Sequence, residues 1–122
     1  MKQNHEAIFV VDDDQGILDS FDALFGDDYP LVLIDDATIA LQVITRENPK
    51  LLFLDIKMPG TNGLEILRKM WEMRSPTKVV ILTALPQDKY EEIACRYGVY
   101  RYLKKPFELE DVEDIAKAVL LH

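Results

Sequence analysis

The sequence of 122 residues contains a single cysteine, Cys95. One cysteine excludes an intrachain disulfide, so the fold must rest on its core, and we expect a reducing compartment. Residues 1–6 are polar and lack the apolar stretch of a signal peptide. No apolar run approaches the roughly 20 residues that cross a membrane. These absences predict a cytoplasmic protein without a membrane segment.

Positive charge is scarce, with 14 Lys and Arg against 22 Asp and Glu and a net charge of −8. Nucleic acids and anionic lipids bind basic patches, so we expect neither direct nucleic-acid binding nor a membrane surface as partner. Histidine is scarce too, since His5 and His122 near the termini are the only two. No Ser, His or Cys triad for acyl transfer is therefore indicated.

An ordinary globular composition accompanies these absences, with 48% apolar and 30% charged residues. The length suits one domain, and we expect residues 1–122 to form it. Short apolar runs alternate with amphipathic helical patterns five times along the chain. The expected strands are 7–11, 31–34, 51–54, 79–82 and 100–103, and the helical patterns begin near residues 17, 37, 64, 90 and 109.

Such alternation predicts an α/β fold with a parallel five-stranded sheet and helices on both faces. Five units suit an open doubly wound (βα)5 sheet better than an eight-unit barrel of about 250 residues. No linker, repeat or low-complexity tract divides the chain.

The run Leu51–Leu54 is apolar without a break, and Asp55 follows it directly. An unbroken apolar run predicts a strand buried on both faces. Asp55 alone could simply start a turn, because aspartate is a common turn residue. Whether Asp55 starts a turn or belongs to a functional site depends on which other residues lie near it in the fold.

Polar side chains follow the other expected strands: Asp12 and Asp13 the first, Thr83 the fourth and Lys105 the fifth. In open α/β sheets, sites lie at the carboxyl ends of the strands, so these side chains should meet Asp55 at one edge. Three carboxylates repel one another unless cations are present, and oxygen ligands suit Mg²⁺ or Mn²⁺. Mg²⁺ and Lys105 together would balance the three negative charges. Asp55 would then be an ionised nucleophile able to form an aspartyl phosphate, with Thr83 and Lys105 neutralising the phosphoryl oxygens.

With these residues, the whole chain resembles the response-regulator receiver domains of two-component signal transduction. The resemblance implies a flavodoxin-like fold with strand order 2-1-3-4-5. The motifs that carry it are Val10-Val11-Asp12-Asp13-Asp14, Asp55-Ile56-Lys57-Met58-Pro59 with Gly63, Leu82-Thr83-Ala84, and Tyr102-Leu103-Lys104-Lys105-Pro106-Phe107.

The resemblance implies a phosphoacceptor and a metal site. Asp55 matches the phosphoacceptor, Asp13 a direct ligand of Mg²⁺, and Asp12 a ligand through water. The backbone carbonyl of Lys57 matches a further metal ligand.

The resemblance also implies a phosphoryl-binding group and a switch. Thr83, the backbone N–H of Ala84, and Lys105 match the groups that hold the phosphoryl oxygens. Tyr102 matches the aromatic switch residue that turns inward as Thr83 moves. The bond before Pro106 is expected to be cis.

Several positions depart from the family's usual pattern. Lys50 and Arg101 stand where an aspartate is frequent, and neither is expected to touch the chemistry. Lys104 is expected to be ordinary surface. Lys57 and Leu85 match positions that tune dephosphorylation, and we expect them to slow the approach of water to the phosphoryl group.

The function implied is a phosphorylation switch. A partner histidine kinase or phosphotransfer protein would phosphorylate Asp55, and the face formed by the fourth helix, fifth strand and fifth helix would control an output partner or effector domain. Tyr97, Tyr100 and Tyr102 mark a candidate contact surface on that face, and dimerisation is left open. No enzyme activity is expected beyond catalysis of its own phosphorylation and dephosphorylation.

Three other functions are weighed against the switch. An aspartyl-nucleophile phosphatase needs a second aspartate where Lys57 stands. A flavin-binding module needs a phosphate-cradling loop after the first strand, where acidic residues would repel a phosphate. A degenerate receiver that binds partners without phosphorylation would not need the complete set of five polar positions.

Overall fold

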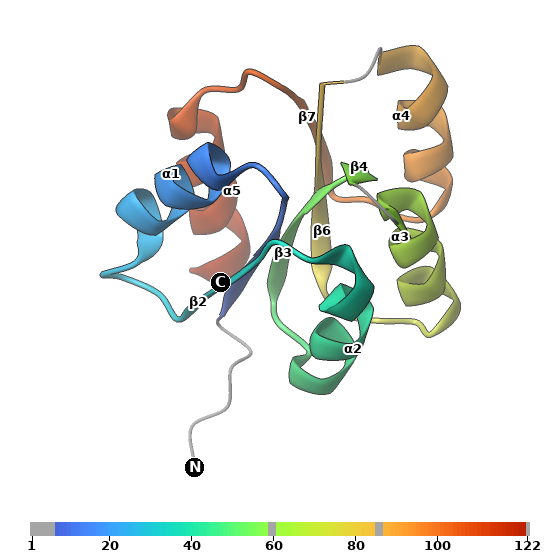
Figure 1. The fold of residues 1–122 in the computed structure, drawn as a ribbon, viewed down its shortest axis with the longest axis horizontal. Helices are drawn as coiled ribbons and strands as arrows, with labels where there is room; N and C mark the ends of the chain where they lie inside the picture. Colours follow the sequence, from blue (N-terminus) through green and yellow to red (C-terminus); the bar gives the residue numbers. More distant parts are fainter. Residues whose placement is uncertain (1–6, 59–60, 85–86, 122) are drawn as a thin grey trace.

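The computed structural model describes residues 7–58, 61–84 and 87–121, which form a sheet between two layers of helices (Figure 1). The sheet has five parallel strands in the order β2-β1-β3-β6-β7. Counted along the chain, this is the predicted order 2-1-3-4-5. The strands are β1 (Ile8–Val11), β2 (Leu31–Ile34), β3 (Leu51–Asp55), β6 (Lys78–Thr83) and β7 (Arg101–Lys104).

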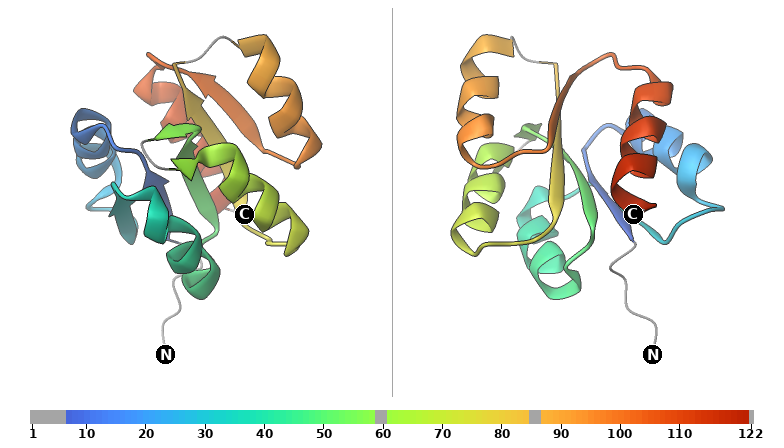
Figure 2. Two further views of the ribbon diagram at one scale, coloured as in Figure 1. Left: turned by 45° about the vertical axis from the view of Figure 1, so that its right-hand side comes forward. Right: turned by 180° about the vertical axis from the view of Figure 1, so that it is seen from behind.

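Helices cover both faces of the sheet, as predicted. Two of them, α1 (Gln15–Phe25) and α5 (Leu109–Leu120), lie on one face (Figure 2). The other face carries α2 (Ala37–Glu47), α3 (Gly63–Glu72) and α4 (Gln87–Arg96). Two apolar cores result, one on each side of the sheet. This double cover explains why β1 and β3 are apolar without a break, since both of their faces are buried.

The helix ends follow local sequence signals. Asp14 and Asp36 cap the N-termini of α1 and α2 with their side chains. Asn48 ends α2 in the left-handed conformation just before Pro49. Gly98 has a φ of 73°, as expected of a glycine that ends a helix. Among the described residues, no helix is long and apolar enough to cross a bilayer.

One feature of the fold was not predicted from the sequence. A two-stranded antiparallel ribbon, β4 (Lys57–Met58) and β5 (Thr61–Asn62), joins β3 to α3. Pro59 and Gly60, between the two strands, lie outside the described residues. The ribbon holds the chain beyond Asp55 in a defined path.

Candidate functional site

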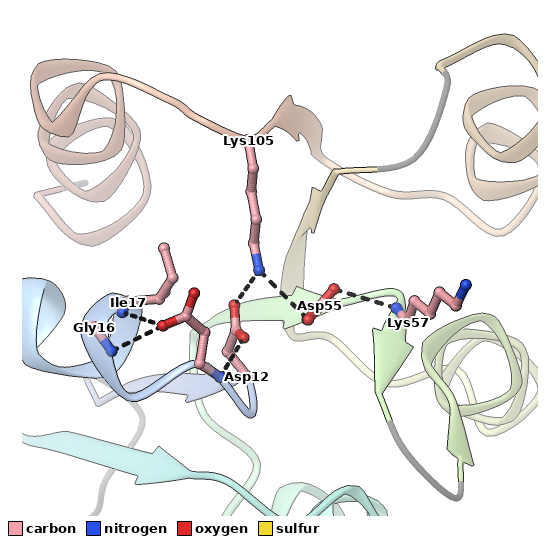
Figure 3. Close-up of polar contacts among 7 residues, drawn as sticks. Asp12, Gly16, Ile17, Asp55, Lys57 and Lys105 are labelled. Carbon is pink, nitrogen blue, oxygen red and sulfur yellow. Dashed lines mark hydrogen bonds and ion pairs between the residues drawn. The ribbon is translucent and has the colours of Figure 1, made fainter.

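Three of the predicted site residues, Asp12, Asp55 and Lys105, meet at the carboxyl edge of the sheet (Figure 3). Asp12 directly follows β1, Asp55 is the last residue of β3, Thr83 is the last of β6, and Lys105 directly follows β7. Because the strands are parallel and β3 is central, their ends deliver all four side chains to one place.

Lys105 lies between two carboxylates. Its Nζ atom is 2.8 Å from Oδ2 of Asp12 and 3.4 Å from Oδ2 of Asp55. The Asp12 side chain is fully buried, and those of Asp55 and Lys105 are 8% and 17% exposed. One ammonium group therefore faces two carboxylates in a largely dehydrated place, which leaves net negative charge.

The neighbouring Asp14 has a structural role. Its side chain accepts hydrogen bonds from the backbone N–H groups of Gly16 and Ile17, and so caps α1. Its own backbone N–H donates to Oδ1 of Asp12 at 2.9 Å. Asp14 thus uses its side chain for the cap while its backbone orients Asp12. Sequence reasoning missed this role, although an aspartate just before a helical pattern is the signal for it.

The carboxylates form a candidate cation site. Oxygen atoms of Asp12, Asp13 and Asp55 lie within 4.8 Å of one another, and Asp13 is exposed at the rim. Oδ2 of Asp12 is buried, and its charged neighbour within the described part of the chain is the Lys105 ammonium at 2.8 Å. An all-oxygen donor set with excess negative charge fits a hard divalent cation.

The pKa of Asp55 reflects the same excess of negative charge. Burial and the Asp12 carboxylate raise the pKa of Asp55 from an ordinary 3.8 to about 6, against the opposing effect of Lys105. Burial lowers the pKa of Lys105, but the two carboxylates more than offset this and raise it. Lys105 therefore stays charged, and Asp55 is the group that needs a further cation to remain ionised.

The backbone on the far side of Asp55 also holds its carboxylate. Oδ1 of Asp55 accepts a hydrogen bond from the backbone N–H of Lys57 at 3.2 Å. The Lys57 side chain is exposed, and Figure 3 shows its ammonium pointing away from Asp55. The tuning role of Lys57 stays a prediction, and Leu85 lies outside the described residues.

The first residue of α3, Gly63, packs its backbone directly against the end of β3. Its N–H bonds to the carbonyl of Ile56. A Cβ at Gly63 would clash with the carbonyl oxygen of Asp55 and lie 2.7 Å from Cα of Ile56. Only glycine fits there, so α3 supports the backbone that carries Asp55.

Gly63→Ala is expected to lower the free energy of unfolding by about 2 kcal/mol, because the new methyl group would overlap the backbone atoms of Asp55 and Ile56 and force them to move. It should also slow phosphoryl acceptance by displacing Asp55. Urea denaturation and phosphorylation assays would measure the two effects. The matched control is Gly98→Ala, where positive φ adds strain but the new Cβ meets nothing within 4 Å. Equal phosphorylation of the two variants would contradict a supporting role for Gly63.

Thr83 ends β6, and Tyr102 lies in the neighbouring strand β7. Thr83 is fully buried, and so is the phenol oxygen of Tyr102. Burial and the Glu91 carboxylate raise the pKa of the Tyr102 phenol, and the Thr83 hydroxyl opposes the rise. The phenol oxygen of Tyr102 is thus buried and close enough to the Thr83 hydroxyl to be affected by it, and the switch role of Tyr102 stays a prediction.

The remaining predicted positions lie around this edge. Ala84 follows Thr83 and is exposed. The backbone N–H of Lys105 donates to the carbonyl of Thr83 at 2.6 Å, and the Lys105–Pro106 bond is cis. Lys104 and Arg101 are exposed and make no described contact with the site carboxylates.

Known proteins of one family are similar to this chain in sequence and in fold. The family model of the response regulator receiver domain matches residues 8–117. Sporulation initiation phosphotransferase F of Bacillus subtilis is 31% identical over 117 residues, covering 95% of this chain and 94% of the relative. Response regulator MprA of Mycobacterium leprae is 32% identical over 114 residues, which are 93% of this chain but only 50% of that protein. A CheY-like receiver domain structure from Methanospirillum hungatei superposes with a TM-score of 0.86 at 29% identity, covering 93% of this chain and 92% of that one.

Proposed function

Since the chain belongs to the response regulator receiver domains, the phosphoryl-accepting switches of two-component signalling, we propose that Asp55 is its phosphoacceptor. One observation carries this proposal: the Asp55 carboxylate stands at the carboxyl edge of the sheet with the Lys105 ammonium 3.4 Å away. A nucleophile and a cation for the developing charge are thus adjacent. We propose further that residues 1–122 act as one receiver domain in the cytoplasm.

The cation would be held by Asp12, Asp13, Asp55 and the backbone carbonyl of Lys57. Mg²⁺ suits this set because it prefers oxygen ligands and keeps several waters, and Mn²⁺ has the same preference. When bound, the ion would supply positive charge that keeps Asp55 ionised and neutralises phosphoryl oxygens.

In the proposed reaction a carboxylate oxygen of Asp55 attacks the phosphorus of a phosphohistidine. The P–N bond breaks, its electron pair stays on the imidazole, and the product is an acyl phosphate on Asp55. The Lys105 ammonium, the Thr83 hydroxyl and the Ala84 N–H neutralise the phosphoryl oxygens.

The phosphoryl donor is a partner histidine kinase or phosphotransfer protein. Charge added at Asp55 draws Thr83 toward it, and Tyr102 and the face formed by α4, β7 and α5 follow, to control an output partner. The chain spans half the length of the matched MprA protein, so the output mechanism is part of the proposal. No other catalytic activity is proposed.

Incubation with acetyl phosphate and Mg²⁺ tests the assignment. The wild-type chain should gain one phosphoryl group by intact mass, and EDTA should prevent this. Asp55→Asn should gain none, because an amide is no phosphoryl acceptor. Asp19→Asn, a change on the exposed part of α1, is the matched control and should be phosphorylated normally. Phosphorylation of Asp55→Asn to the wild-type level would refute the proposal.

Trp71, the single tryptophan, gives a readout of the switch. Its ring lies on α3 with its centroid 5.4 Å from that of Tyr97, which directly follows α4. If phosphorylation shifts α4, this contact changes, and Trp71 fluorescence should change with it. The signal should vanish in Tyr97→Leu, which removes the ring contact, but persist in Tyr29→Leu, whose ring packs on Phe25 instead. A phosphorylation-dependent signal of equal size in Tyr97→Leu would contradict movement of α4.

A further inference from the structure

Charge is distributed unevenly along this acidic chain. Residues 46–78 carry seven basic and four acidic side chains, a net charge of +3, whereas the rest of the chain carries −11. The basic segment includes the whole of α3 and ends at the start of β6. The chain therefore has one segment of net positive charge in an otherwise strongly acidic sequence, which favours contacts between unlike segments of different molecules.

The end of α3 is hollowed on both sides, far from the phosphorylation site. A hollow of about 250 Å³ lies between α3 and the end of α4, and one of about 220 Å³ lies between α3 and the end of α2. Met70, Arg74 and Ser75 line both hollows, so the two adjoin at these residues, and we call the pair of hollows the Arg74 groove. Each hollow is too small for a drug-sized ligand but has room for a side chain.

The side chains at the Arg74 groove are of the types that carry binding energy in protein interfaces. Trp71 and Met73 are 53% and 51% exposed on either side of Arg74. Of the described residues that line the groove, only Arg74 is charged, and its guanidinium joins no ion pair among the described residues. Exposed Trp, Met and Arg side chains are enriched where proteins associate. The groove thus fits an apolar side chain flanked by carboxylates.

The same chain carries such a segment at the start of α5. Glu108, Leu109 and Glu110 are all exposed, and Leu109 is 43% exposed. We call these three residues the acidic knob. Acidic residues near a helix N-terminus are favoured by the helix dipole, but the dipole gives no reason for an exposed leucine between them. In Figure 1 the start of α5 lies at the upper left and the end of α3 at the lower right, so the knob and the groove are at opposite sides of one molecule.

We propose that the Arg74 groove binds the acidic knob of a second copy of this chain, with Leu109 seated beside Trp71 and the knob carboxylates facing Arg74. The contact joins different surfaces of the two copies, so each copy can bind one neighbour at each end. Association should therefore continue beyond the dimer as concentration rises, and high salt should weaken it.

Sedimentation of the full, unphosphorylated chain tests this. The weight-average mass of the wild type should rise with concentration and pass that of a dimer. Arg74→Glu, Arg74→Gly and Leu109→Ala should each lower the association constant by about fivefold or more, as expected for loss of about 1 kcal/mol. Arg74 has a φ of 55°, so glycine removes its side chain without backbone strain and the variant stays folded.

Lys78→Glu is the matched control, because Lys78 is exposed in the same basic region but lines neither hollow. Its association constant should stay within about twofold of the wild type. A mixture of Arg74→Glu with the double variant Leu109→Ala/Glu110→Lys should form pairs and stop there, since only one knob and one groove remain intact. A constant monomer mass up to about 1 mM, a dimer insensitive to Arg74, or equal loss in Lys78→Glu would each overturn the proposal.

Discussion

Lys105→Met is expected to lower the free energy of unfolding of the metal-free protein at pH 7.5 by about 3 kcal/mol or more. The reason is the fully buried Asp12, whose charged neighbour is the Lys105 ammonium at 2.8 Å. Methionine keeps the apolar stem of the side chain but leaves a buried carboxylate without its counter-charge. Removing one partner of a buried ion pair costs more than the pair itself contributes.

Denaturation by urea with EDTA present would measure this loss. Lys104→Met is the matched control, because it removes the same charge from the exposed neighbouring residue and should change stability by less than about 0.5 kcal/mol. Added Mg²⁺ should return part of the loss, since a bound cation replaces the missing charge. Equal stability of the two methionine variants would contradict the claim that Lys105 balances the charge of the buried Asp12.

Asp55→Asn is expected to raise the free energy of unfolding of the metal-free protein at pH 7.5 by about 1–3 kcal/mol. The folded-state pKa of Asp55, about 6, lies above its ordinary 3.8, so the folded chain holds the proton more tightly than the unfolded chain. Ionisation of Asp55 therefore costs stability as pH rises from about 4 to about 6, and the cost stays constant above that. At 1.36 kcal/mol for each unit of pKa, the upper limit is about 3 kcal/mol. Asparagine removes this cost.

The stability gained by Asp55→Asn should decrease as the pH is lowered from 7.5. At pH 5 it should be about half of its value at pH 7.5, because Asp55 is then mostly protonated in the folded wild type. Saturating Mg²⁺ should reduce or reverse the gain, since the cation stabilises the ionised wild type and not the amide. Asp19→Asn, which removes an exposed carboxylate, is the matched control for the loss of one negative charge. A variant less stable than the wild type in EDTA at pH 7.5 would contradict the raised pKa of Asp55.

The strand ends could be located from the sequence because the signal there is simple. The apolar runs before Asp12 and Asp55 need cover on both faces, which only a parallel sheet between helical layers provides. Once the sheet is parallel, the residues that end its strands must share one edge. The positions of Asp55, Thr83 and Lys105 therefore follow from the sequence without any knowledge of distances.

Other features depend on close contacts that no local pattern reveals. Residue 63 must be glycine because it touches the backbone of Asp55 and Ile56. The helical pattern of α3 does not reveal this contact, since neither residue belongs to that helix. The ribbon of β4 and β5 pairs only two residues on each side, too few to give a strand signal. The raised pKa of Asp55 depends on burial and on its distance from Asp12, and both need the folded structure.

Chemical mapping of the phosphoryl group tests the central claim most directly. The chain would be phosphorylated with acetyl phosphate and Mg²⁺ and reduced with borohydride, which converts an aspartyl phosphate to homoserine. Peptide mass spectrometry would then locate the reduced residue. We predict homoserine at position 55, with Asp12 and Asp13 unchanged. Reduction at another aspartate, or a phosphoryl group that survives borohydride on a hydroxyl or histidine, would contradict the assignment of Asp55 as the phosphoacceptor.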